Sequence, residues 1–575
     1  MSAPASAHEG PFPEMMRLAV MDQVEPFMKR LDPEGFFRQE DPRSNCLNDG
    51  QFIYPLAYVY RVRFAGNRYC REPGILDAVR RIGDFIAART LPSGEILAGA
   101  FGYTWKAVDQ RLLTCWMDAH VLIRTELSAG RRKRWESAMR HSLANVAARV
   151  KGYLDQERFS SLSFDTSPNH ACLYGSTLLL GATLFQQKEW RSLALAFMDR
   201  FVRFQTPEGY WPEGGGPVGI YNMVTLAGVA RAEALCPRPA YRRALARALA
   251  YSDTVLYPDG TFVTLIDKRQ HYYPRPFIWG MFGLTHWPRG RALLRQSCRA
   301  RLRIQEPFTG DDAARWLENY VHYRPGPLPR YAPWKGTRFL GNYAALFRQK
   351  GWQWNFSVHA SVVNPRSPFQ LDQQNFFSLR HDAAGLIVAD SQDKSRPKHY
   401  TFLLNGPDDL GVFGGGRIGA LARPPYVEAV YSNGLTGRVS VNAITPQRMI
   451  VRAVERTPTI SSHGYQIGKY IPAAGLCFNL PLYVHQGATL RVGRRKFVLA
   501  RKKLAIPVPA GGRVTLFGGK VLLKPRTPAI LHYPCEPFNP YARDNKSKPD
   551  TWFLRMELPM KGKPRSAEIE IEVRA

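Results

Sequence analysis

The chain has 575 residues, of which 45% are hydrophobic, and its 79 Lys and Arg exceed its 47 Asp and Glu to give a formal net charge of +32. A globular chain of this length is too long for one ordinary hydrophobic core, so we expect two or more domains. The charge favours a polyanionic partner, which would be nucleic acid, anionic lipid or an acidic polysaccharide.

Nucleic acid and membranes are the weaker choices. The sequence has no zinc-finger spacing, no Walker loop and no long basic tail. No apolar run is long enough to span a bilayer, and residues 1–13 lack a basic region followed by an apolar core. We therefore expect a soluble protein without a visible export signal, and its oligomeric state stays open. Any single basic cluster, such as 131–134, 494–496 or 501–503, can equally be a solvated face.

Apolar residues recur at helical spacing from Met15 to about Leu328. Gly- and Pro-rich turns separate several of these segments, which predicts antiparallel helical hairpins. Their loops are rich in aromatic residues that could stack on sugars in one cleft, so an α/α toroid fits better than an extended solenoid. The predicted helices cover 74–90, 107–127, 135–153, 172–185, 189–204, 222–235, 240–256 and 289–303.

After a Pro-rich connection at 324–329 the apolar period changes to two, which indicates strands. We therefore predict an antiparallel β-sandwich, with a toroid domain at 1–335 and a sandwich domain at 336–575. The predicted strands cover 354–360, 376–380, 385–389, 400–404, 438–441, 449–454, 489–492, 496–500, 514–517 and 568–573.

In one stretch of the helical half, polar residues lie at the predicted start of a helix. Ser167 and Pro168 mark the beginning of a helix, so Asn169 and His170 fall in its first turn. About fifty residues later the sequence Gly-Tyr-Trp-Pro-Glu-Gly-Gly-Gly at 209–216 leads to Tyr221. By themselves these residues also fit a helix cap, a turn and a core tyrosine.

Taken together and in this order, these residues resemble those of the heparinase II/III-like and alginate lyase-like polysaccharide lyases. Those proteins have an N-terminal α/α toroid and a C-terminal antiparallel β-sandwich. The segments 367–376, 388–391 and 399–406 resemble a second motif of the family, in its sandwich, although two of its histidines are replaced here.

The resemblance also bears on metal binding, because family members commonly hold a structural zinc in the sandwich. The matching positions here are Gln370, Asp390 and His399. Glutamine is a poor ligand for zinc, so Asp390 and His399 are weak candidates, and we expect no bound zinc and no cofactor.

The activity implied by the resemblance is β-elimination at a uronic acid of an anionic polysaccharide. The enzyme must stabilise enolate-like charge, remove the proton next to the carboxylate and protonate the leaving oxygen. By resemblance, Asn169 would hydrogen-bond the carboxylate, and His170 would neutralise it or act as the base. Tyr221 would be the acid, or base and acid in turn, and His359 would complete the site from the sandwich.

Further residues are expected to bind substrate, and a strongly positive cleft would favour the tyrosinate form of the base. Some are aromatic residues that would stack on sugars, and others are polar or basic groups near the predicted cleft. They are Trp105, Tyr210, Trp211, Glu213, Arg269, His271, Tyr272, Arg275 and Arg417.

Two other functions stay open. An α/α-barrel glycoside hydrolase acting on uronides would need two carboxyl groups, or an acid and a water, and the candidates are Asp109, Asp118, Asp165 and Glu213. A non-catalytic glycan-binding protein of the same fold would need neither. The resemblance implies a secreted or periplasmic protein.

Overall fold

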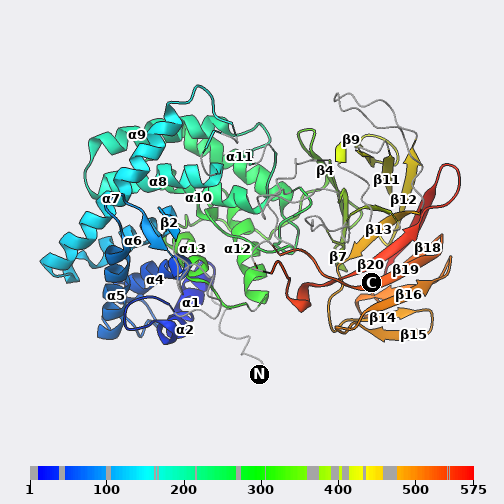
Figure 1. Cartoon of the computed structure of the whole chain (residues 1–575), viewed down its shortest axis with the longest axis horizontal. Helices are drawn as coiled ribbons and strands as arrows, with labels where there is room; N and C mark the ends of the chain where they lie inside the picture. The colour runs from blue at the N-terminus through cyan, green and yellow to red at the C-terminus, as the bar shows by residue number, and fades with distance from the viewer. Residues whose placement is uncertain are drawn as a thin grey trace. The chain divides into compact units, whose positions relative to one another are not determined.

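The computed structural model of the chain forms two compact units (Figure 1). Unit 1 comprises Met1–Gly215, Ile220–Tyr251 and Pro276–Tyr331, and unit 2 comprises Gly216–Gly219, Ser252–Arg275 and Ala332–Ala575. Two short segments of the helical half, 216–219 and 252–275, therefore belong to unit 2, which the sequence did not indicate. The structure describes residues 11–37, 46–98, 105–160, 163–164, 167–213, 216–266, 274–304, 306–358, 375–389, 400–404, 413–431, 435–456, 475–539, 542 and 544–574.

Unit 1 is helical apart from a small hairpin, β1 (Ile96–Ala98) and β2 (Trp105–Ala107). No helix in the described part of the chain is both long enough and apolar enough to cross a membrane. The main helices of unit 1, of which α11 continues into unit 2, are α1 (Glu14–Met21), α2 (Val24–Arg30), α3 (Cys46–Gly50), α4 (Ile53–Arg61), α5 (Pro73–Arg89), α6 (Gln110–Ile123), α7 (Ala129–Leu154), α8 (Pro168–Leu184), α9 (Lys188–Phe201), α10 (Ile220–Leu235), α11 (Pro239–Val255), α12 (Pro288–Arg303) and α13 (Gly310–Val321).

The helices of unit 1 alternate between two layers. In the inner layer α4 contacts α6, α6 contacts α8 and α8 contacts α10, while in the outer layer α5 contacts α7 and α7 contacts α9. The short 3-10 helix η3 (Met281–Leu284) contacts both α10 and α13, and α13 contacts α4, which closes the inner layer into a ring. This arrangement is the predicted α/α toroid.

Helix α8 is apolar on all sides because helices surround it. Glycines let its neighbours approach, since a Cβ at Gly175 would lie 2.5 Å from the Phe197 ring of α9. A Cβ on Gly228 of α10 would lie 2.6 Å from the sulfur of Cys172 and 3.0 Å from its backbone. An all-round apolar helix is expected to be buried, and α8 and α10 are both of this kind.

Unit 2 is built from antiparallel strands that form two packed sheets. Within the described residues, one sheet has the order β15-β14-β17-β18-β21-β12-β11-β10-β9 and the other β16-β19-β20-β13-β7-β6-β5-β4-β3, with β8 paired to β13. The strands are β3 (Gly336–Leu340), β4 (Ala344–Gln349), β5 (Trp352–Ser357), β6 (Phe377–His381), β7 (Gly385–Val388), β8 (Phe402–Leu404), β9 (Phe413–Gly419), β10 (Tyr426–Tyr431), β11 (Thr436–Ala443), β12 (Arg448–Arg456), β13 (Leu476–Leu482), β14 (Thr489–Val492), β15 (Arg495–Val498), β16 (Leu504–Val508), β17 (Val514–Leu516), β18 (Val521–Pro525), β19 (Ala529–Cys535), β20 (Phe553–Pro559) and β21 (Ser566–Val573).

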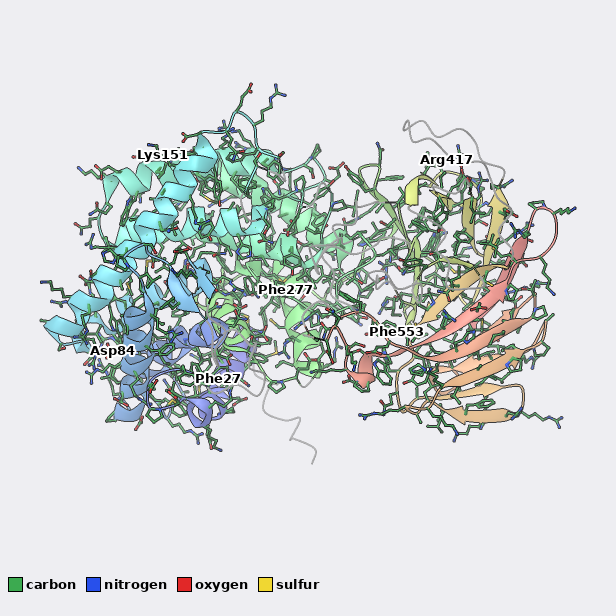
Figure 2. The ribbon with its side chains drawn as sticks, in the orientation of Figure 1. Phe27, Asp84, Lys151, Phe277, Arg417 and Phe553 are labelled. Carbon is green, nitrogen blue, oxygen red and sulfur yellow. The ribbon has the colours of Figure 1, made fainter. Side chains whose placement is uncertain are left out.

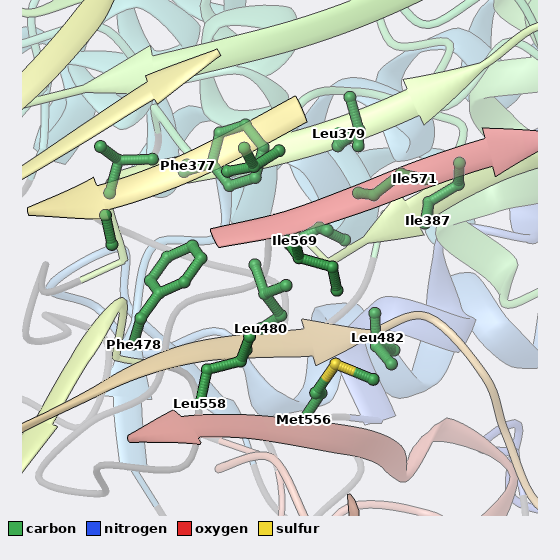
Figure 3. Close-up of a cluster of buried hydrophobic side chains, with 14 of the residues drawn as sticks. Phe377, Leu379, Ile387, Phe478, Leu480, Leu482, Met556, Leu558, Ile569 and Ile571 are labelled. Atoms are coloured by element: carbon green, nitrogen blue, oxygen red, sulfur yellow. The ribbon is translucent and has the colours of Figure 1, made fainter. Parts of the chain in front are cut away.

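One hydrophobic core lies between these sheets. Leu480 of β13 and Met556 of β20 come from one sheet, and Ile569 and Ile571 of β21 come from the other (Figure 3). Burying such side chains contributes roughly 1.5–3 kcal/mol each relative to leaving them exposed. The structure thus confirms the predicted β-sandwich.

Tyr257 and Asp259 contact the sheet that contains β5 and β6 through polar groups. The Asn355 side chain donates to the hydroxyl of Tyr257 and to Ser378, at 2.9 Å in each case. Arg380 of β6 forms an ion pair with Asp259, with 3.4 Å between Nε and Oδ2. A polar network of this kind fixes one arrangement, because each buried partner would be costly to leave unpaired.

The close contact between α8 and α10 can be tested with a pair of glycine variants. We expect Gly228→Ala to destabilise the protein by about 1–3 kcal/mol, because the added methyl has no room against Cys172. The matched control is Gly152→Ala in α7, where a Cβ meets nothing within 4 Å and helix propensity favours Ala by about 0.5–1 kcal/mol. Thermal unfolding of both variants measures the difference, and equal melting temperatures would contradict this packing.

Candidate functional site

The first turn of α8 holds Asn169 in a fixed orientation. Ser167 precedes the helix in extended conformation and Pro168 occupies its first position. The hydroxyl of Ser167 donates to Oδ1 of Asn169 at 2.9 Å, and Nδ2 of Asn169 donates to Oε2 of Glu213 at 2.8 Å. A carboxylate only accepts hydrogen bonds, so Glu213 determines which way the amide faces. Asn169 has no exposed surface, so a substrate could reach its amide only if neighbouring side chains shift.

His170 follows directly and is partly exposed. Its Nδ1 lies 2.5 Å from Nε2 of Gln110, a residue that is only 1% exposed. An amide NH₂ can only donate, so in this arrangement Nδ1 accepts and the proton of the neutral ring sits on Nε2. Gln110 therefore determines the tautomer that His170 presents.

Tyr221 lies in the first turn of α10 and is also partly exposed. Asn222, beside it, donates to the carbonyl of Trp211 at 3.1 Å. Glu213, two residues further on, accepts from Asn169. The 211–213 turn therefore connects the first turns of α8 and α10 and brings the elements of Asn169 and Tyr221 together.

A buried chain of alternating charges lies in the same inner ring. Arg111 pairs with Asp109 at 2.9 Å and with Asp311 at 3.7 Å, and Arg315 pairs with Glu318 at 2.7 Å. Arg231 then contacts Glu318 at 3.4 Å and also forms an ion pair with Asp118. This charge chain links α6, α10 and α13, and it begins at Asp109, directly before Gln110.

Burial affects the carboxyl groups of the charge chain differently. Burial raises the pKa of Asp311 to about 7, although Arg111 and Arg315 oppose the shift. Burial also acts to raise the pKa of Asp109, but the charge and hydrogen bonds of Arg111 outweigh it, so the pKa falls. Asp109 accepts the backbone N–H of Arg111 at 2.9 Å and of Leu112 at 3.1 Å, and so caps α6.

Two residues that were predicted to stack on sugars, Trp211 and Tyr210, are buried in the structure. Trp211 is 1% exposed and its ring stacks on Phe201, with centroids 6.3 Å apart. Tyr210 is 3% exposed and packs on Tyr251 at 5.4 Å. A buried ring offers no face to a sugar, so the expectation of stacking is corrected for both residues, and both pack in the interior of unit 1.

Of the other residues predicted to bind substrate or metal or to complete the site, the structure describes only a few. Arg275 belongs to unit 2 and is partly buried. Arg417 projects from β9 of unit 2 (Figure 2), is 60% exposed and pairs with Glu428 at 2.8 Å. Trp105 lies in β2, and nothing is described of its side chain. His359, Arg269, His271, Tyr272, Gln370, Asp390 and His399 lie outside the described residues.

The carboxyl groups proposed for a hydrolase are committed to other contacts. Asp109 and Asp118 belong to the charge chain, and Glu213 holds Asn169. Asp165 lies outside the described residues. A carboxyl group held in such contacts is less available as the acid or base that glycoside hydrolysis requires.

Two partners were missed by sequence reasoning, namely Gln110 for His170 and Ser167 for Asn169. In the sequence, Ser167 indicates only the start of a helix. Gln110 directly follows Asp109, which caps α6, so its place at a helix start was the signal that could have identified it. Its partner could not be identified in this way, because His170 lies 60 residues further along the chain.

Comparison with known proteins gives matches in structure. No family model matches the chain, and no curated protein matches its sequence. The Streptomyces coelicolor A3 chondroitin AC lyase, solved in complex with chondroitin sulphate, shares 12% identity at a TM-score of 0.54, over 100% of this chain and 80% of that one. Heparinase III shares 12% identity at a TM-score of 0.55, over 94% and 80%. The chain therefore has the fold of heparinase- and chondroitinase-like polysaccharide lyases, as the resemblance in its sequence predicted.

The raised pKa of Asp311 predicts a pH dependence of stability. Between about pH 4 and 7 the folded state keeps a proton that the unfolded state has lost, so the free energy of unfolding falls as pH rises through this window. Asp311→Asn removes this contribution. We expect the free energy of unfolding of the variant, relative to wild type, to increase by a few kcal/mol from pH 4 to pH 8, at about 1.4 kcal/mol per pKa unit. Denaturant unfolding at several pH values measures this, and parallel curves would show that Asp311 does not titrate in this range.

Proposed function

We propose that the chain is a polysaccharide lyase that cleaves an anionic, uronate-containing polysaccharide by β-elimination. The observation that carries the proposal is the set of contacts at the starts of α6, α8 and α10, where Glu213 orients Asn169 and Gln110 orients His170 beside the turn that leads to Tyr221. The likeness in fold to chondroitin AC lyase and heparinase III supports the reaction class.

The contacts support a division of roles between His170 and Tyr221. With Nδ1 accepting from Gln110, His170 presents Nε2–H as a donor, which suits the carboxylate of the substrate. A ring that donates from Nε2 cannot take a proton there, so we assign the base to Tyr221. Asn169 donates one amide hydrogen to Glu213. We assign its other amide hydrogen to the carboxylate of the substrate, which it could reach after a local shift.

In the elimination step, Tyr221 as phenolate takes the proton from the carbon next to the carboxylate. The electron pair of that C–H bond forms a carbon–carbon double bond as the bond to the glycosidic oxygen breaks. The oxygen takes a proton, which Tyr221 can return, so water is not consumed. Donors aimed at the carboxylate stabilise the enolate-like charge that develops during the step.

The positive end of a helix adds to this stabilisation. The first turns of α8 and α10 lie at the positive ends of their helix dipoles, so an anion there is favoured. This effect also favours the phenolate form of a tyrosine in a first turn.

Hydrolysis by an α/α-barrel glycosidase is the competing enzyme function, and non-catalytic glycan binding is the other alternative. The engagement of Asp109, Asp118 and Glu213 in fixed contacts disfavours hydrolysis. Neither alternative requires the defined orientation of both Asn169 and His170.

The reaction class can be tested with the purified full chain and a panel of uronate polysaccharides. Elimination creates an unsaturated uronide that absorbs in the ultraviolet, so we expect absorbance to rise with at least one polymer. We expect Tyr221→Phe to lose about 10²–10⁴-fold in kcat, which is the usual contribution of general acid–base catalysis. Tyr241→Phe, which removes a buried hydroxyl on α11, is the matched control. New reducing ends without absorbance would establish hydrolysis instead, and full activity of Tyr221→Phe would exclude its assigned role.

The positioning role of Gln110 has a spectroscopic signature. In protein with ¹⁵N-labelled histidine, we expect Nδ1 of His170 to be unprotonated at neutral pH, with the signal assigned by its loss in His170→Gln. Gln110→Glu places an acceptor at Nδ1, so the proton should move to that nitrogen and kcat should fall. A protonated Nδ1 in the wild-type protein would contradict the proposed orientation, whatever the activity.

A further inference from the structure

A long stretch of unit 2 carries basic residues without acidic ones. Between residues 475 and 535 the sequence has no Asp or Glu. Its Lys and Arg residues are Arg491, Arg494, Arg495, Lys496, Arg501, Lys502, Lys503, Arg513, Lys520, Lys524 and Arg526. An acid-free stretch of this length produces a strong local positive potential.

Eight of these residues lie in, or close in sequence to, strands β14, β15 and β17 at one end of a sheet. Strands β14 and β15 form a hairpin, and among the described strands β15 lies at the edge of its sheet (Figure 1). Leu490 and Val514 point into the core, so the alternating positions Arg491 and Lys496 face solvent. We call the exposed basic residues here the hairpin surface: Arg491, Arg494, Arg495, Lys496, Arg501, Lys502, Lys503 and Arg513.

The strand register places like charges opposite each other. Arg491 pairs directly with Lys496, and like charges at directly opposed positions destabilise a sheet. Within the described residues, no ion pair is formed by any member of the hairpin surface. This differs from the same sheet further in, where Lys524 of β18 pairs with Glu570 at 3.0 Å and Glu572 at 2.8 Å.

Protection of an exposed edge does not account for this charge. Charged side chains on an edge strand prevent edge-to-edge association, and Arg495 and Lys496 of β15 could serve that purpose. Arg491 lies on β14, which is already paired on both sides, and Arg513 and residues 501–503 lie outside the hairpin. The charge therefore extends beyond the edge that it would protect.

We propose that the hairpin surface binds an anionic polysaccharide chain and so forms a second substrate-holding site, separate from the residues of unit 1 that carry the chemistry. This inference rests on the proposed function for the identity of the polymer. Carboxylate and sulfate groups along such a chain are the ligands that arginine and lysine side chains recognise.

The alternatives fit less well. Binding of single-stranded nucleic acid needs aromatic platforms, but the one aromatic residue among these strands is Phe497, which is partly buried and lies beneath Arg495. A membrane-surface site needs a continuous apolar face, and Val498, at 55% exposed, is the large exposed hydrophobic residue of the hairpin.

A pocket adjoins one end of the hairpin surface. Lys503 lines a cavity of about 370 Å³ whose wall also includes His532 and Arg555. This volume falls in the range of small-molecule sites, which is roughly 300–1,000 Å³. The pocket gives a bound chain a place for one sugar unit beside basic groups.

The proposal is tested by removing two charges from the hairpin and, as a control, two from elsewhere. Arg491→Gln/Lys496→Gln changes the hairpin, and Arg132→Gln/Lys133→Gln removes the same charge from the exposed side of α7. Both pairs are made in the full chain carrying Tyr221→Phe, so that the polymer is not cut. Binding of chondroitin sulphate and of unsulfated alginate is measured by calorimetry at several salt concentrations.

We expect the hairpin variant to bind at least one polymer tenfold or more weakly. Its plot of log Kd against log salt should be shallower by about one to two, since each lost ionic contact removes about 0.7–0.9 in polyelectrolyte binding. The α7 control should stay within about twofold of the parent. Equal binding by the two charge variants would overturn the proposal, as would a loss of binding restricted to duplex DNA or to phosphatidylserine vesicles.

The two proposals fail in different ways. If the wild-type chain eliminates a polymer but the hairpin variant binds it like the control, the hairpin inference fails and the lyase stands. If no polymer is eliminated but the hairpin variant alone loses binding, the lyase proposal fails and the binding surface stands. Increased self-association with unchanged binding would assign the charges to edge protection and would overturn the inference.

Discussion

The arrangement of unit 1 depends on the buried charge chain that joins α6, α10 and α13. Three arginines, Arg111, Arg231 and Arg315, lie between four carboxyl groups. The side chains of Arg231 and Arg315 are buried, and that of Arg111 is 21% exposed. Removing one partner of a buried pair costs about 3–5 kcal/mol because the other charge is left uncompensated. If one of these helices slid along its axis, several ion pairs would break together. The charge chain therefore fixes the axial positions of these inner helices.

Fixed axial positions matter because the candidate site is made of helix beginnings. Gln110 starts α6, Asn169 and His170 lie in the first turn of α8, and Tyr221 lies in the first turn of α10. A shift of one helix by a single residue moves its first turn by about 1.5 Å, which exceeds the tolerance of the 2.5–2.8 Å contacts of His170 and Asn169. The charge chain begins at Asp109, so the same contacts that hold the ring also place Gln110.

The fold was predictable because apolar residues recur with strong helical and strand periods. The strands that the prediction missed have physical causes. The structure contains a helix at every predicted position, and the hairpin pattern correctly indicated a toroid. Strand β13 was missed because Asn479 and Pro481 interrupt its apolar run. Strands β18 and β19 were missed because each contains a proline that interrupts the pattern.

The candidate site was predictable only in part. Asn169, His170 and Tyr221 could be selected because they stand in a recognisable order along the chain. The partners that orient them could not, since hydrogen bonds across 44 and 60 residues leave no local pattern. Trp211 shows the converse, because an aromatic residue in a glycine-rich turn has the same sequence signature whether its ring faces a ligand or, as here, Phe201.

The basic residues that produce the net charge differ in whether an acidic partner neutralises them. Arg111, Arg231 and Arg315 add to the formal charge of +32 but are neutralised inside the ring, so they attract nothing from solution. Arg491 and Lys496 face solvent opposite each other with no acid between residues 475 and 535, so their field extends to a ligand. A polyanion is therefore attracted to the sandwich by excess charge, whereas the helix starts of the toroid would recognise one carboxylate by oriented hydrogen bonds. Unoriented attraction and oriented recognition make different demands on a fold: the first tolerates the flexible side chains of an exposed hairpin, and the second requires the rigid inner ring.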